Sequence, residues 1–206
     1  MTTARAYTMG LVAGLGILGV ADTVRAADRP RQERVPVSFS GGHEIGKHDF
    51  GRPVVLIAAA LGVKPEVFRE AFSGVTPARG RGPTGAEARR NKAALLRVLA
   101  PHGVSNERLD QMSNYYRFRP ERGELWPTRT AEAHAIVVDG QIKRIVVTDP
   151  GAGYCSPPRV EVAGFAKVDF EVTLAVGKDL KRNGGIDKIE VVPAKRSPLS
   201  QAASES

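Results

Sequence analysis

The densest group of side chains able to do chemistry lies in the glycine-rich stretch at 38–52, SFSGGHEIGKHDFGR. It contains two histidines and two carboxylates that could bind a metal ion: His43, Glu44, His48 and Asp49. The helical zinc motif His-Glu-x-x-His places both imidazoles on one face, but these histidines are five positions apart and surrounded by glycine. A loop can still present such ligands, so one hypothesis is a metal-dependent hydrolase that uses these four residues. The alternative is a loop whose polar groups bind its own backbone or cap the following helix.

The chain has one cysteine, Cys155, in the stretch GAGYCSPPRV at 151–160. A cysteine nucleophile needs a histidine base and a group that orients the base, and no signature joins Cys155 to His134, the nearest histidine in sequence. The two glycines suit a turn with positive φ, and the two prolines favour extended backbone before a strand at Arg159. We therefore interpret the stretch as a turn that leads into β structure, in which Cys155 is tolerated.

Positive charge is concentrated in the first part of the chain. Residues 1–129 contain 20 Lys and Arg against 12 Asp and Glu, whereas residues 130–206 contain 10 against 10. Arginines that alternate with aromatic rings could hold a polyanion, and the residues that we select for this role are Arg89, Arg90, Lys92, Arg117 and Arg119. An anionic envelope polymer or acidic glycan fits an exported protein better than nucleic acid does. The alternative is a solvated helix face.

The first 26 residues have the pattern of a secretory signal peptide. Arg5 precedes an apolar run at 6–21, and the small residues of Val24-Arg25-Ala26 suit cleavage after Ala26 or Ala27. The apolar run is shorter than the about 20 residues that cross a bilayer, so an uncleaved anchor is less favoured. We expect an exported protein, periplasmic or extracellular, without a membrane span once the signal is removed.

Periodicity predicts an α+β fold in two parts. After a flexible lead-in and glycine-rich loop at 27–52, a helical unit at 53–129 should contain four helices in two hairpins. The first helix should lie between Pro53 and Gly62, and the second should begin at Lys64-Pro65. The capping box of Thr84 and Glu87 should begin the third, which Gly103 ends, and Ser105 should cap the fourth. The glycine-valine pairs at 62 and 103 open similar segments 41 residues apart, which suggests a repeated hairpin.

From residue 130 the apolar period becomes two, which predicts an antiparallel β unit at 130–192. A hairpin should turn at Asp139-Gly140, and a further strand should cover 168–176. GQIKRIVV at 140–147 returns as GGIDKIEV at 184–191, so a second copy of that strand is expected. Trp126 should anchor the two units to each other, and the polar tail at 193–206 should be disordered.

Two resemblances rest on these residues. VTDPGAGYCSPPRVEVAG resembles the Gly-Ser-Gly-Tyr, Ser-Ala-Pro, Thr-Val β repeat of large bacterial surface proteins and some phage fibre-like proteins. Gly151, Gly153, Tyr154, Pro158 and Val160 match it, whereas Asp149-Pro150 and Cys155 depart from it. The order of helical and β segments over residues 40–192 looks like that of a set of exported bacterial proteins that carry no known activity. The resemblances imply β architecture and export, and they imply no catalytic residue.

These observations favour an exported, non-catalytic binding or structural module over an enzyme. We expect no cofactor, unless the histidine-rich loop binds metal. The expected partner is an anionic envelope polymer, an acidic glycan or another surface protein. The metal-dependent hydrolase and the polyanion-binding protein remain the alternatives.

Overall fold

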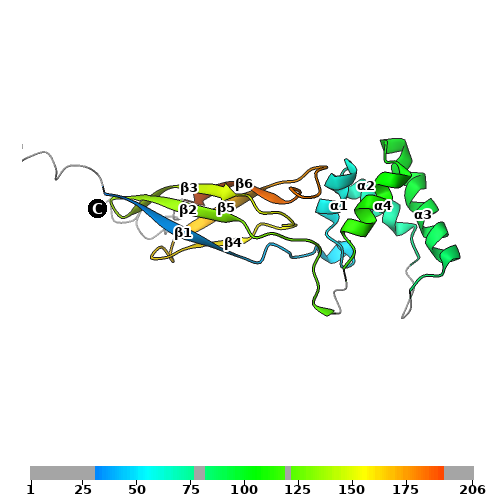
Figure 1. Ribbon diagram of the computed structural model, residues 1–206, viewed down its shortest axis with the longest axis horizontal. Coiled ribbons are helices and arrows are strands. Elements are labelled where there is room, and N and C mark those ends of the chain that lie inside the picture. Colours follow the sequence, from blue (N-terminus) through cyan, green and yellow to red (C-terminus); the bar gives the residue numbers. More distant parts are fainter. Residues whose placement is uncertain (1–30, 77–81, 119–121, 193–206) are drawn as a thin grey trace, which may run out of the picture. The chain divides into compact units, whose positions relative to one another are not determined.

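The computed structural model describes residues 31–76, 82–118 and 122–192, and the fold is α+β as predicted (Figure 1). The chain divides at Pro30 into two units, and all the described residues belong to the second. The predicted signal peptide at 1–26 and tail at 193–206 therefore lie outside the described residues.

Four α-helices form at the predicted places. Their bounds are α1 Val54–Leu61, α2 Pro65–Ser73, α3 Gly85–Leu99 and α4 Asn106–Tyr115, with short 3-10 helices at Lys47–Asp49 and Ala100–His102. The capping box at the start of α3 is complete: the Glu87 N–H donates to Thr84 Oγ1 (3.3 Å), and the Glu87 carboxylate accepts from the Thr84 N–H (2.7 Å). Helix α2 packs against α1 and α3, and α4 packs against α1.

The two similar segments of the helical part, 41 residues apart, share the same kind of helix ending. Gly62 (φ 76°) and Gly103 (φ 81°) both adopt the left-handed conformation. The next residue then bonds back five positions, from the Val63 N–H to the Ala58 oxygen (3.0 Å) and from the Val104 N–H to the Leu99 oxygen (3.4 Å). Both turns are Schellman motifs, in which glycine avoids the steric cost of positive φ.

The β part contains two antiparallel sheets. Their strands are β1 Gln32–Ser40, β2 Glu132–Val138, β3 Gln141–Asp149, β4 Arg159–Val162, β5 Asp169–Ala175 and β6 Gly185–Val192. The order is β3-β2-β1-β4 in one sheet and β5-β6 in the other (Figure 1). The predicted hairpin turn has Asp139 at φ 51° and Gly140 at φ 73°. The strands β3 and β6, which contain the similar sequences at 140–147 and 184–191, contact each other across the two sheets.

Strand β1 corrects one prediction, because residues 27–52 are not all lead-in and loop. The charged, proline-bearing stretch at 28–34 suggests a flexible lead-in, yet β1 pairs with β2 from Gln32 to Pro36 and with β4 from Val37 to Ser40. Pro36 lacks an N–H donor, and it lies where the pairing changes from one neighbour to the other. Both partners are distant in sequence, so local propensity could not reveal them.

Trp126 joins the helical and β parts, as predicted. Its side chain is 2% exposed within the helical core, and its indole N–H donates to the Gly153 oxygen (2.8 Å). Gly153 has φ 87°, and a Cβ there would lie 2.7 Å from the Pro127 oxygen. The glycine at this position is therefore required by the close approach of two backbone segments.

Candidate functional site

The glycine-rich loop at 41–52 and the cysteine-containing turn at 151–158 are bound to each other. The Cys155 and Ser156 N–H groups donate to the Gly42 oxygen (2.9 and 3.2 Å), and the Glu44 N–H donates to Ser156 Oγ (3.1 Å). The Ser156 hydroxyl donates in turn to the Glu44 carboxylate. The glycine-rich loop thus serves as a clamp for the turn that precedes β4.

The four proposed metal ligands point to different partners. The His43 ring stacks on Tyr154 (5.4 Å between centroids), whereas Asp49 accepts from Arg69 Nε (2.7 Å). Glu44 belongs to the serine clamp, and His48 is exposed. Within the part of the chain that the structure describes, no group of three or more His, Cys, Asp or Glu side chains could hold a metal ion. The structure therefore does not bring these four side chains together: His43 stacks on Tyr154, while Glu44 and Asp49 hold the loop in place. The metal centre stays a prediction.

The clamp residues are also poorly placed for nucleophilic catalysis. The Cys155 thiol donates to the main-chain oxygen of Glu44 (3.4 Å). Burial, and after it the negative charge of the Glu44 carboxylate, raises the pKa of Cys155 to about 11. The thiol is therefore protonated at neutral pH, whereas a cysteine nucleophile must be a thiolate. The hydrogen bond from Ser156 lowers the pKa of Glu44, so this carboxylate is ionised and cannot serve as a general acid at neutral pH.

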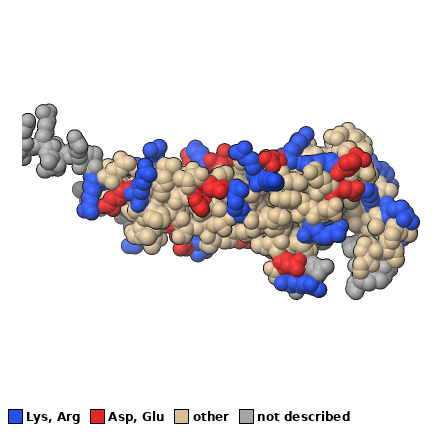
Figure 2. Space-filling model, in the orientation of Figure 1, with Lys and Arg blue, Asp and Glu red and all other residues tan. Residues whose placement is uncertain are grey.

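Of the residues proposed for polyanion binding, some are exposed and others already bind polar partners within the protein. Arg89 and Arg90 are exposed on α3, but Lys92 donates to Asp110 (2.7 Å) and Arg117 donates to Asn114 (3.2 Å). Arg119 lies outside the described residues. On the face seen in Figure 2, acidic side chains lie among the basic ones. Polyanion binding remains a prediction.

The helical part instead carries two adjoining clefts that the sequence patterns did not predict. They share the residues Phe50, Arg52, Phe68 and Phe72. The Met112 cleft, of about 350 Å³, is completed by Ile57, Leu95, Met112, Tyr116, Arg117 and Phe118 among others. The Arg69 cleft, of about 550 Å³, is completed by His48, Asp49, Val54, Arg69, Ser73 and Val75. Aromatic and aliphatic side chains with a few arginines form the walls, which is the usual composition of a ligand site.

Phe50 is the most exposed large apolar side chain among the described residues, at 78%. Its backbone is left-handed (φ 48°), which costs free energy for a bulky residue. The preceding short helix is held by the buried Asp49, whose carboxylate binds Arg69 (2.7 Å), and this hydrogen bond raises the pKa of Arg69. The contact between Asp49 and Arg69 thus holds the backbone next to Phe50, whose ring is exposed and lines both clefts.

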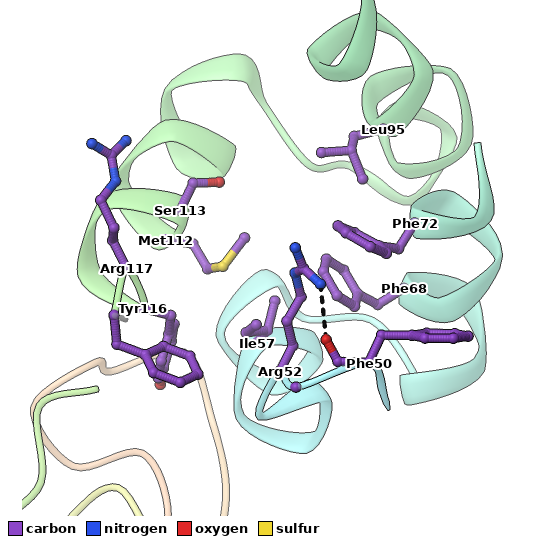
Figure 3. A pocket seen from close by; sticks show the side chains of 12 residues that line it. Phe50, Arg52, Ile57, Phe68, Phe72, Leu95, Met112, Ser113, Tyr116 and Arg117 are labelled. Atoms are coloured by element: carbon purple, nitrogen blue, oxygen red, sulfur yellow. Dashed lines mark hydrogen bonds between the residues drawn. The ribbon is translucent and has the colours of Figure 1, made fainter. Parts of the chain in front are cut away.

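Arg52 lies at the boundary between the clefts. Its guanidinium carbon is 3.9 Å from the centroid of the Phe72 ring, and its Nη1 donates to the Phe50 oxygen (3.2 Å). Figure 3 shows this side chain pointing into the Met112 cleft, between Met112 and the two phenylalanines of α2. Burial lowers the pKa of Arg52 from its ordinary value, which records the cost of removing the cation from water.

The sequence did carry a signal for this site. An aromatic residue within the polar, glycine-rich segment HDFGRP has no strand or helix pattern to bury it. The prediction for that segment concerned only its metal-capable side chains and left out Phe50. Phe68 and Phe72 are four positions apart and so lie on one face of α2, and only the structure shows that Phe68 is buried whereas Phe72 is partly exposed in the clefts.

Comparison with known proteins gives no match to a family model, a curated protein or a solved structure. Over residues 31–76, 82–118 and 122–192, none of the helices has the length and apolar character required to cross a membrane.

Proposed function

We propose that this protein is an exported, non-catalytic binding module of the cell envelope or extracellular space, and that it binds a polypeptide of another surface protein. The observation that carries the proposal is Phe50, which is exposed, left-handed and placed between two apolar clefts. Full burial of a phenylalanine side chain is worth about 1.5–3 kcal/mol, and a partner that covered Phe50 would recover part of this free energy. A single exposed apolar side chain is common, but Phe50 adjoins two largely apolar clefts, and large exposed apolar surfaces mark interaction sites.

The state of the nucleophile and acid candidates supports a non-catalytic role. Cys155 is a protonated thiol at neutral pH, and the hydroxyl of Ser156 donates to an ionised carboxylate, with no imidazole as its acceptor. A serine nucleophile usually gives its proton to a histidine base. The arrangement around Glu44 therefore fits a structural clamp.

The binding part of the proposal can be tested with the purified protein and a display library of short random peptides. Enriched peptides should bind the wild type, and Phe50→Asn should weaken their binding by about tenfold or more. Val176→Asn is the matched control, since Val176 is also exposed (46%) but lines neither cleft. If Phe50→Asn and Val176→Asn bind the selected peptides as tightly as the wild type, the proposed function is wrong.

The export part has its own test. The protein is expressed with its native N-terminus in a bacterial host, and the mass of the purified chain is measured. Cleavage after Ala26 or Ala27 should give a chain that begins at Ala27 or Asp28. Recovery of the uncleaved chain from the cytoplasm would contradict export and leave the binding test unaffected.

A further inference from the structure

The boundary between the two clefts carries a positive charge that has no counter-ion among the described residues. Arg52 forms part of the wall of both clefts, and no carboxylate of the described residues forms an ion pair with its guanidinium. Its one hydrogen bond to a described group goes to the Phe50 oxygen. Most of the five N–H donors of the guanidinium are therefore available to a ligand.

The other arginines of the clefts differ from Arg52. Arg69 donates to Asp49 (2.7 Å) and to Glu66 (3.3 Å), so its charge is already neutralised. Arg117 is exposed and bonds Asn114, so water solvates its charge. Arg52 is only partly exposed and stacks on Phe72, which leaves its edge free for a carboxylate.

The apolar surfaces lie on both sides of this charge. On one side the Met112 cleft presents Ile57, Leu95 and Met112, and on the other side the Arg69 cleft presents Val54 and Val75. A fatty acid carries its carboxylate at one end of a single apolar chain, so it could fill one cleft but not both. A polypeptide can place apolar side chains before and after an acidic residue.

We infer that the ligand is a polypeptide segment in which an Asp or Glu carboxylate binds Arg52, while apolar side chains on either side of it occupy the Met112 and Arg69 clefts. This inference rests on the proposed function, because it names the chemistry of the partner at the same site. The carboxylate fixes the register of the segment, and the two apolar side chains supply most of the buried area.

The test uses peptides selected from the display library. Enriched sequences should contain an acidic residue with apolar residues on both sides. Each selected peptide is then compared with its amide counterpart, Asp replaced by Asn or Glu by Gln, on the wild type and on Arg52→Gln. We expect the amide to weaken binding to the wild type by about tenfold or more and to change binding to Arg52→Gln by less than about twofold.

Two further variants separate charge from folding. Arg52→Lys keeps the charge and should retain part of the preference for the acidic peptide, and it replaces Arg52→Gln if the latter does not fold. Arg144→Gln removes an exposed charge on β3, outside both clefts, and should leave the preference unchanged. Peptides that depend on Phe50 but lack an acidic residue, or an equal loss of the acid preference in Arg144→Gln, would overturn the inference and leave the proposed function standing.

Discussion

The side-chain amide of Asn183 donates a 2.7 Å hydrogen bond to the main-chain oxygen of Leu56, which joins the loop before β6 to the first turn of α1. The same amide nitrogen donates to the Tyr116 hydroxyl (2.8 Å), and its oxygen accepts from the Gly177 N–H (2.9 Å). The residue is 2% exposed. One side chain therefore links two helices to the β part, and its amide has at least one partner on each polar atom.

Replacement of Asn183 by alanine should lower the free energy of unfolding by about 2–4 kcal/mol, because it removes two buried hydrogen bonds and one partly buried one and leaves unsatisfied partners. Urea denaturation followed by circular dichroism measures this change. Asn91→Ala is the control: the Asn91 side chain makes two exposed hydrogen bonds, both to the Thr76 backbone, and its loss should cost about 1 kcal/mol or less. Equal losses in the two variants would show that Asn183 is not a structural link.

Gly184 should tolerate alanine far less than Gly164 does. Both have positive φ (71° and 83°), so both variants carry the backbone cost of about 1 kcal/mol. A Cβ at Gly184 would also collide with the Tyr154 backbone oxygen and lie 2.6 Å from Leu56 Cδ2, whereas a Cβ at Gly164 meets open space. Gly184→Ala should therefore lose at least about 2 kcal/mol more than Gly164→Ala in the same denaturation experiment. Similar losses would mean that the α1 contact yields easily.

Cys155→Ser should keep the free energy of unfolding within about 1 kcal/mol of the wild type, because a hydroxyl can donate to the Glu44 oxygen as the thiol does. The raised pKa, about 11, also predicts slow modification of the wild type by a disulfide reagent at pH 8. The rate should approach that of free cysteine only after unfolding in urea. Rapid modification of the folded protein would contradict both the raised pKa and the structural role.

The helices could be predicted from the sequence because their signals are local. The capping box of Thr84 and Glu87, and the glycines at 62 and 103, act within one turn of the helix that they begin or end. The strand β1 could not, since its pairing with β2 involves residues about a hundred positions away, such as Val35 with Ala135. The stability of β1 comes from these distant partners.

The candidate site was missed for a related reason. Sequence spacing can suggest ligating groups, but the clefts arise where Phe50 and Arg52 of one loop meet Phe72 of α2 and Met112 of α4. The spacing of these residues has no regular period. The reverse holds for His43 and Asp49, which are close in sequence but contact separate partners, Tyr154 and Arg69.

His43 should make the protein less stable in acid. Burial lowers its pKa from the ordinary value, although the nearby Glu44 charge acts in the opposite direction, and its buried Nε2 has no hydrogen-bond partner among the described residues. The unfolded chain therefore binds a proton more readily than the folded one, so stability is lost as the pH falls below the ordinary histidine pKa and through the lowered one. The melting temperature measured between about pH 7.5 and pH 5 should fall less steeply in His43→Phe than in the wild type. His48→Gln, at an exposed position, should follow the wild type; a wild-type slope in His43→Phe would rule out this origin.

Phe50 should be a residue that costs stability in the free protein. Asparagine adopts the left-handed conformation at lower cost than phenylalanine, and an exposed ring gives up little burial, so Phe50→Asn should match or exceed the wild type by up to about 1 kcal/mol in the free energy of unfolding. Phe50→Ala removes the ring but keeps the backbone cost, so it should be less stable than Phe50→Asn by about 0.5–1 kcal/mol. Urea denaturation of the three proteins, with the peptide affinity of each, separates the two contributions. If Phe50→Asn were instead destabilised by more than about 2 kcal/mol, the ring would be a core residue of the helical part, and its role as a binding group would have to be abandoned.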